Sequence, residues 1–274
     1  MEQQEKSIKD VKGRSRGISA GIVLVACFII SILLFFFLFG KTGNFEGGIR
    51  SNHPIQGNYL GLVYKGGPVV MIIIGLLLTT LTLSVERFIA LSRAKGKGNL
   101  INFVAQLKSL LANNDFKAAD ALCEEQRGSV AAVVSAGLKK YEDMATTKED
   151  LTKEQKILNI QKEIEEATAL ELPTMEQNLP VIATFSTLGT LFGLLGTVIG
   201  MIRSFSALAT AGAPDSVALA TGISEALINT ALGIATGATA IIAYGYFTGK
   251  IDNITYAIDE MGFSLAQTFA EKNK

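Results

Sequence analysis

The sequence predicts an all-α membrane protein with four transmembrane helices, a helical cytoplasmic domain between spans 2 and 3, and long helices extending into the cytoplasm. Of the 274 residues 49% are hydrophobic and only 18% are charged. The charges avoid four runs, residues 18–39, 66–85, 181–202 and 217–249, apart from one acid, Glu225, in the last run. A bilayer core about 30 Å thick needs roughly 20 helical residues, so each run is long enough to cross it. Buried helices of a soluble protein explain these runs less well, because such helices average about a dozen residues and carry a polar face.

The first run follows a basic tail, and a secretory signal peptide is the alternative to a membrane anchor. The run is longer than the apolar core of a typical signal peptide, and no small-x-small cleavage site follows it at residues 40–43. We therefore interpret it as a retained first span. Basic residues also follow the second run closely, at Arg87, Arg93, Lys95 and Lys97. Cytoplasmic loops are enriched in such residues, so we expect both termini and the segment between spans 2 and 3 in the cytoplasm.

These assignments divide the chain in order along its length. The segments are a cytoplasmic basic tail (1–17), span 1 (18–39), a periplasmic loop (40–66), span 2 (67–86), a helical cytoplasmic domain (87–179), span 3 (180–208), a periplasmic turn (209–216), span 4 (217–249) and a cytoplasmic C-terminal helix (250–274).

The two segments outside the membrane differ in their apolar content. The periplasmic loop is rich in Gly and poor in apolar residues, so we expect a linker near the membrane surface, with His53 as a solvated side chain. The cytoplasmic segment has helical periodicity, a stop-and-restart signal at residues 113–115 and a candidate cap at Ser129. Its last helical pattern approaches span 3 so closely that the two are expected to form one rod, bent at Pro173 and Pro180.

Span 3 combines hydroxyl groups with small residues on one side. On a helical wheel its polar and small residues fall within about 80° of one another. They are Ser186, Thr190, Gly193, Thr197, Gly200 and Ser204. Two small-residue pairs, Gly189 with Gly193 and Gly196 with Gly200, have the spacing that lets helices approach closely. Tight packing alone would explain the glycines, whereas the hydroxyls favour a face that meets water or polar partners.

Span 4 has a similar stripe, and it contains the acid. Thr221, Glu225, Asn229, Thr236 and Thr239 share about 80° of the wheel. If the helix starts near residue 216, Glu225 lies roughly 13 Å along its axis, inside the hydrocarbon. A charged group there costs roughly 2.5–3.5 kcal/mol even on the lenient insertion scale. We therefore predict that Glu225 faces a cavity or a partner and has a functional role; a structural hydrogen bond to a neighbouring helix is the alternative.

Other chemistry has no support in the sequence. It contains no P-loop, zinc motif or nucleophile elbow, so we expect a channel component and not an enzyme. Cys27 and Cys123 fall in a span and in the cytoplasm, which excludes a disulfide between them and offers no metal spacing. The net charge of zero and the lack of a basic stripe give no indication of nucleic-acid binding. We expect no cofactor, with protons as the coupling ion.

Two segments then carry a family resemblance. GLLGTVIGMIRSF at 193–205 and GISEALINTALGI at 222–234 resemble the paired signatures of the MotA/TolQ/ExbB proton-channel family, in its ExbB branch. Residues 119–138 are similar to the family's cytoplasmic pattern, and the likeness covers roughly residues 68–250. Span 1 lies outside it. Thr190 and Thr239 stand where the family usually has Pro, so straighter helices with more polar faces are expected.

The resemblance implies a function and a set of partners. It implies a homo-oligomer, a pentamer, around a dimer of ExbD-like single-span subunits that bear a membrane Asp, with energy passed from the proton-motive force to a TonB-like protein in the inner membrane. By motif, Glu225 corresponds to the intramembrane acid, and Thr197 and Thr230 to the signature threonines. With Thr190, Asn229 and Thr236 they form our candidate proton pathway, although Thr230 lies about 140° from Glu225 on the wheel. Gly189, Gly193, Gly196 and Gly200 are assigned to helix packing.

Alternatives remain open at this stage. Within the family, a TolQ-like envelope role or a MotA-like stator for motility fits the same residues, and the four-span layout is the MotA arrangement. Outside it, a solute transporter or a non-conducting membrane scaffold would also keep an acid in a span. Transporters commonly show internal repeats, and none is evident between spans 1–2 and spans 3–4.

Overall fold

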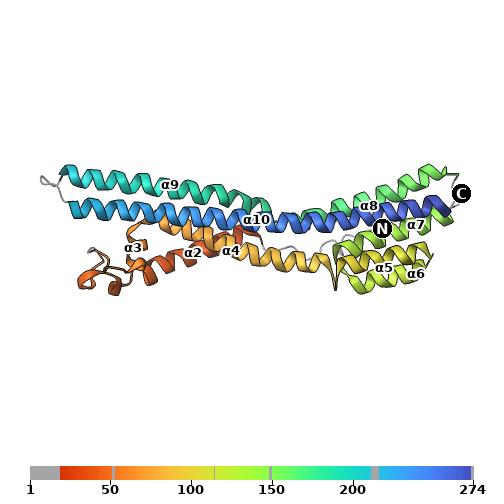
Figure 1. Cartoon of the computed structure of the whole chain (residues 1–274), viewed down its shortest axis with the longest axis horizontal. Coiled ribbons are helices and arrows are strands. Elements are labelled where there is room, and N and C mark those ends of the chain that lie inside the picture. The colour runs from red at the N-terminus through yellow and green to blue at the C-terminus, as the bar shows by residue number, and fades with distance from the viewer. Residues whose placement is uncertain (1–18, 51–52, 114, 148–149, 211–215, 273–274) are drawn as a thin grey trace, which may run out of the picture. The chain divides into compact units, whose positions relative to one another are not determined.

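Helices form almost the whole of the described chain. The computed structural model describes residues 19–50, 53–113, 115–147, 150–210 and 216–272. The α-helices labelled in Figure 1 are α2 (Ala20–Leu34), α3 (Tyr59–Lys65), α4 (Pro68–Lys95), α5 (Leu100–Ala112), α6 (Phe116–Gln126), α7 (Gly128–Thr146), α8 (Lys153–Glu176), α9 (Leu179–Thr210) and α10 (Ser216–Lys272). A π-helical turn, Phe35–Phe39, continues α2, and two 3-10 turns, Thr42–Asn44 and Glu46–Gly48, follow it.

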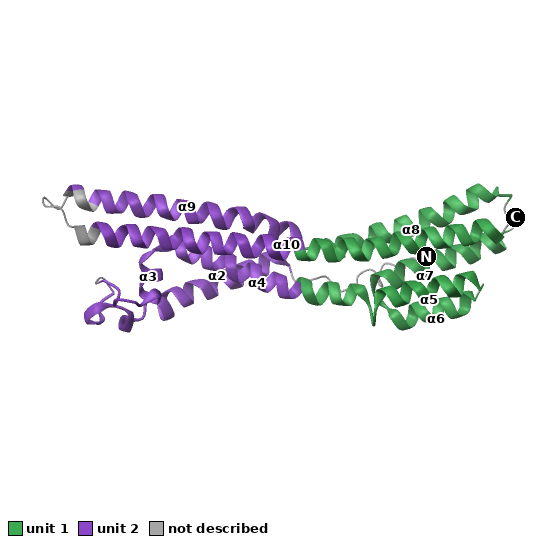
Figure 2. Cartoon of the chain, in the orientation of Figure 1, with its two compact units in different colours: residues 1–17, 87–177, 246–274 green, residues 18–86, 178–245 purple. Residues whose placement is uncertain are grey.

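The predicted fold class is confirmed. Four helical segments of the described chain are long and apolar enough to cross a membrane, and they lie within Ala20–Phe39, Pro68–Ala112, Lys153–Ser206 and Leu219–Lys272. The described residues form two compact units (Figure 2). Unit 1 contains residues 87–177 and 246–272, and unit 2 contains residues 19–86 and 178–245. Helices α4 and α10 contribute residues to both units.

Unit 1 is a helical domain with its own core. In α5, Leu107 and Leu111 are fully buried one turn apart, as an amphipathic helix requires. The ring of Tyr141 in α7 lies between Phe116 of α6 and Phe269 of α10, with ring centroids 4.5 and 5.0 Å away. These contacts join helices distant in sequence, so the domain does not depend on the membrane for its core.

The predicted starts of two helices in unit 1 have different outcomes. Asp115 accepts a hydrogen bond from the Ala118 amide and begins α6, as predicted. The predicted cap at Ser129 is wrong, because α7 already begins at Gly128 and the Ser129 hydroxyl donates to the Glu171 carboxylate at 3.0 Å. Burial of Glu171 explains this use of the hydroxyl, since a buried carboxylate must be hydrogen-bonded.

The prediction of one rod from α8 into α9 is wrong. Helix α8 ends at Glu176, α9 begins at Leu179, and Asn178 between them has φ of 66°. Asn tolerates this left-handed conformation better than most residues. Pro173 lies within α8 and Pro180 in the first turn of α9, where proline is accepted.

A buried arginine closes the end of α8 within unit 1. The Arg87 guanidinium, 1% exposed, donates from Nη1 to the carbonyl oxygens of Thr174 and Met175 at 3.1 and 3.3 Å. The last carbonyls of a helix have no partner within the helix, so this side chain satisfies two of them.

In unit 2, span 1 packs against span 2 through one face. Val23, Cys27, Ser31 and Phe35 recur every fourth residue and are buried. The Ser31 hydroxyl donates to the Met71 carbonyl at 2.6 Å. Other apolar side chains of α2 are exposed, as expected for a helix in lipid.

The loop after span 1 is more ordered than predicted. Phe45 is 1% exposed, and its ring lies 5.5 Å from that of Tyr64, which stacks on Phe35 at 4.7 Å. Asn44 donates to the carbonyls that end span 1, at 2.9 and 3.0 Å. The expectation of a linker without a core is therefore wrong, because three aromatic rings supply a small one.

Candidate functional site

Helices α9 and α10 meet along the glycines of span 3. A Cβ added at Gly189 would lie 3.0 Å from Thr236, one at Gly196 would lie 2.5 Å from Asn229, and one at Gly200 would lie 2.6 Å from Ala226. Gly193 lies against Gly233 in the same way. The four glycines predicted to pack helices therefore face α10, which Figure 1 shows running beside α9.

Two signature threonines meet in this contact. The hydroxyls of Thr197 in α9 and Thr230 in α10 are hydrogen-bonded to each other, and Thr230 Oγ1 also donates to the Gly193 carbonyl at 3.3 Å. A hydroxyl both donates and accepts, so such a pair can pass a proton between neighbours without bearing charge. The polar stripe of span 3 thus lies largely against α10.

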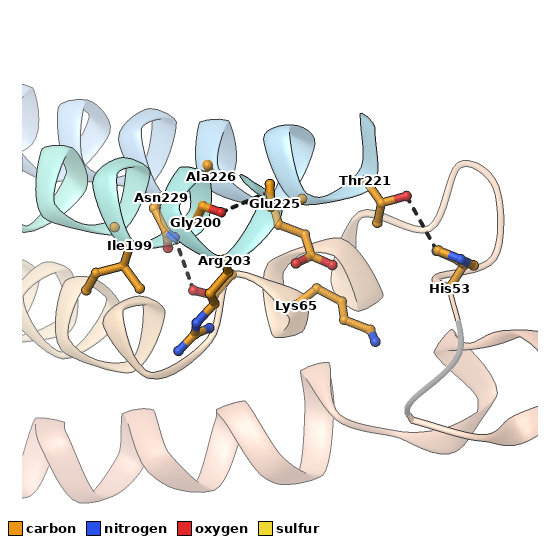
Figure 3. A pocket seen from close by; sticks show the side chains of 13 residues that line it. His53, Lys65, Ile199, Gly200, Arg203, Thr221, Glu225, Ala226 and Asn229 are labelled. Carbon is orange, nitrogen blue, oxygen red and sulfur yellow. Dashed lines mark hydrogen bonds between the residues drawn. The ribbon is translucent and has the colours of Figure 1, made fainter. Parts of the chain in front are cut away.

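Glu225 lines a polar pocket in unit 2, on the side of α10 where α3 meets α4. The pocket has a volume of ≈ 230 Å³, and its lining includes Lys65, Arg203 and Asn229. Figure 3 shows the carboxylate pointing towards this junction, where the Lys65 side chain lies. The acid is half-buried, and the pocket brings it beside charged and amide side chains. The prediction that it faces a cavity is consistent with this position.

Asn229 lies one turn beyond Glu225 and connects the site to span 2. Its Nδ2 donates to the Gly66 carbonyl at 3.1 Å, and it is almost fully buried. Its Oδ1 is buried and accepts no hydrogen bond from the described residues. A buried acceptor without a donor is costly, so this atom is suited to bind a water or a proton donor in the pocket.

The remaining candidates are not gathered around Glu225. The Thr190 side chain is exposed and donates to the Ser186 carbonyl, and the buried Thr236 donates to the Leu232 carbonyl. Thr230 does not line the Glu225 pocket, in agreement with the wheel angle between the two residues. A role for these residues in a proton pathway stays a prediction.

Sequence analysis missed the basic residues of the pocket. Lys65 and Arg203 line it, and His53, expected to be merely solvated, is exposed but lies 3.4 Å from the Thr221 hydroxyl at its rim (Figure 3). Lys65 and Arg203 are the charges that flank uncharged runs. That position was a usable signal for Arg203, whereas the approach of His53 depends on the loop fold.

Known proteins match the part of the chain that contributes α9 and α10 to this site. The sequence pattern of the MotA/TolQ/ExbB proton channel family matches residues 125–260, which include the α9–α10 contact and Glu225. The chain belongs to this family. The family is one of proton channels, and the four candidate spans agree with a multi-pass membrane protein.

Individual relatives in the MotA/TolQ/ExbB family are similar over shorter stretches. The Tol-Pal system protein TolQ of Pseudomonas aeruginosa is 39% identical over 84 residues, 31% of this chain and 36% of that one. A putative biopolymer transport protein ExbB homolog of Methanothermobacter thermautotrophicus is 37% identical over 90 residues, 33% of this chain and 32% of that one. The biopolymer transport protein ExbB of Pseudomonas putida is 33% identical over 88 residues, 32% and 27% of the two chains. The matches therefore span about a third of these relatives.

Proposed function

We propose that this chain is an ExbB-like subunit of a proton-motive-force-driven motor in the bacterial inner membrane. In this proposal both termini are cytoplasmic and protons are the coupling ion, with no cofactor. Copies of the chain form a ring, a pentamer, around an ExbD-like dimer that bears a membrane Asp. The ring and the dimer share the proton pathway, and energy passes to a TonB-like protein for transport at the outer membrane.

One observation carries the proposal: an acid in a helix apolar enough to cross a membrane lines a polar pocket together with Lys65 and Asn229. The cost of a charged side chain in the hydrocarbon makes such residues typical of ion and proton pathways. The unpartnered Asn229 Oδ1 next to it supports an exchangeable proton or water at this level. Thr230, the member of the Thr197–Thr230 pair on α10, lies roughly 7.5 Å from Glu225 along the helix axis.

The roles follow from this arrangement. Glu225 takes up and releases the proton, and Asn229 holds the donor that exchanges with it. Thr197 and Thr230 join α9 to α10 and present hydroxyls that neither gain nor lose net charge. One acid suffices in this chain because the second carboxylate of the relay is supplied by the partner.

A first experiment tests assembly. The full chain is expressed with its chromosomal neighbours and purified in detergent, and its native mass and co-purifying chains are determined. A ring that contains a small single-span subunit with a membrane Asp is the expected result. A monomer or dimer without such a subunit contradicts the motor and favours a transporter or a scaffold.

A second experiment tests Glu225 in the purified complex. Glu225→Gln keeps the shape and removes the exchangeable proton, so the complex should assemble normally while proton flux into vesicles falls to the level of protein-free vesicles. Glu166→Gln is the matched control, because that exposed carboxylate on α8 lies outside the pocket, and it should retain full flux. Normal flux and normal energy-dependent output with Glu225→Gln would leave only a structural role for the acid.

A TolQ-like role is the second candidate, because the TolQ relative of Pseudomonas aeruginosa is 39% identical to this chain over 84 residues. The same purification separates the two, since the partners that co-purify differ. A MotA-like stator would also contain the acid. Loss of motility on deletion of the gene for this chain would favour this alternative.

A further inference from the structure

A second and larger cavity lies wholly within unit 1, on another part of α10. It is a groove of ≈ 830 Å³ between the end of α4, the first turns of α5 and residues 246–260 of α10. Its floor is apolar: Leu91, Val104, Phe247, Ile254 and Ala257 line it and are buried. Pockets of this size with mainly apolar walls and few polar groups are typical of small-molecule and lipid sites.

The groove begins where two spans end. Phe88 follows the uncharged run of span 2, and Tyr246 belongs to the last turns of the uncharged run of span 4. Both side chains line the groove and are about half exposed, at 56% and 49%. Aromatic side chains in this position typically lie at the level of the lipid headgroups. The near end of the groove is therefore within reach of the bilayer surface.

Positive charge lies beyond these aromatic residues, at Lys250 one turn after Tyr246 and at Lys95, the last residue of α4. Lys95 of α4 and Lys250 of α10 line the groove, and neither forms an ion pair with another described residue. Lys250 Nζ lies 5.5 Å from the centre of the Tyr246 ring, which holds it beside the aromatic rim. At the far end Lys108 is neutralised by Glu260, roughly 15 Å beyond Lys250 along α10.

We propose that this groove binds an anionic phospholipid from the adjoining leaflet. Lys95 and Lys250 bind its phosphate, and its hydrocarbon lies against Phe88, Leu91 and Phe247. Basic pockets beside membrane helices commonly select anionic headgroups, whereas a zwitterionic lipid gains little from two lysines.

The chain contains no Trp, so a single introduced Trp would be its only Trp fluorophore and can report lipid contact with the groove. Phe88→Trp places one fluorophore on the near rim, in the full chain reconstituted into phosphatidylcholine vesicles. A fixed fraction of the lipid is then either brominated phosphatidylglycerol or brominated phosphatidylcholine, both of which quench Trp on contact. Two lysines near the surface predict an association constant about 30-fold higher for the anionic lipid. This preference should weaken as salt is added.

Matched variants distinguish lipid bound in the groove from lipid that contacts the protein elsewhere. Lys95→Gln with Lys250→Gln should abolish the preference, while Lys139→Gln with Lys162→Gln, which removes two charges of unit 1 outside the groove, should leave it unchanged. Ile22→Trp, on an exposed face of span 1, should be quenched equally by both lipids. Tyr246→Trp is a second groove reporter if Phe88→Trp does not fold.

Two results would overturn the proposal. Equal quenching of the groove reporter by both lipids would mean that the lysines select no headgroup. Weak quenching by both brominated lipids would mean that the groove is filled by protein, either a second copy of the chain or a partner. Neither result bears on Glu225, because the assay measures lipid contact without proton flux.

Discussion

Gly233→Ala tests the close approach of α9 and α10 most directly. A Cβ at Gly233 would lie 2.6 Å from the Gly189 carbonyl oxygen and 2.7 Å from the Gly193 Cα. Both atoms belong to backbone, so no side-chain rotation relieves the contact. The helices must separate by about 0.8 Å to bring the closer of these contacts to ordinary van der Waals distance. Overpacking of this kind typically costs about 1–3 kcal/mol.

Gly245→Ala on the same helix is the matched control. A Cβ there meets nothing within 4 Å, so only the gain from removing a helical Gly remains, about 0.5–1 kcal/mol. The stability of both purified variants is measured by unfolding in detergent, followed by far-ultraviolet circular dichroism. Gly233→Ala should be less stable than the parent protein, and Gly245→Ala should be equally stable or more stable.

The same variants should differ in function. Separation of the helices lengthens the contact between Thr197 and Thr230, so proton flux of the assembled complex should fall with Gly233→Ala and persist with Gly245→Ala. Equal stability of the two variants would refute the reasoning, since it would mean that α9 and α10 do not touch at Gly233.

Three further predictions concern unit 1. Arg87→Met leaves two buried carbonyls at the end of α8 without a donor, so the free energy of unfolding should fall by about 2–5 kcal/mol, measured by denaturant titration. An unchanged free energy of unfolding would contradict the role of Arg87 as the donor to these carbonyls. Thr152→Ala removes the side chain that caps α8 and should cost about 1 kcal/mol, while Thr152→Ser should retain most of the stability. Burial, and then the charge of Asp120, raises the pKa of the Cys123 thiol from 9.0 to about 12. As the pH rises, the thiol of the unfolded chain is deprotonated at a lower pH than the thiol of the folded chain. The contribution of this thiol to the free energy of unfolding is therefore fully present below pH 9 and declines as the pH rises from 9 towards 12. Alkylation at pH 8 should therefore require unfolding, and rapid labelling of the folded protein would show that the thiol is accessible.

The spans and the acid were predictable because the bilayer imposes simple rules. A charge inside the hydrocarbon is costly, so the uncharged runs mark the membrane and Glu225 stands out against them. Helix periodicity likewise indicated α5, since Phe103 and Leu107 recur at helical spacing and both are buried. These features depend on residues close together in sequence.

The errors arose where distant or subtle contacts decide the structure. Proline rules predicted one rod bent at Pro173 and Pro180, whereas the chain turns at Asn178, which tolerates a left-handed backbone. Ser129 has the composition of a cap, but the buried Glu171 uses its hydroxyl instead. The contact of Asn229 with Gly66 joins residues far apart in the chain, and no local pattern indicates it.

Span 1 changes what surrounds span 2. The flank of α4 that contains Met71 and Gly75 is covered by α2, with the Phe28 ring against Gly75. In a chain without this helix, mobile acyl chains would solvate that flank and exchange with the bulk bilayer. Here α2, which is part of the same chain, covers that flank and cannot exchange with the bilayer. In the proposed ring a neighbouring subunit must therefore approach through other faces, and the exposed side of α9 around Val198 and Phe205 is available for it.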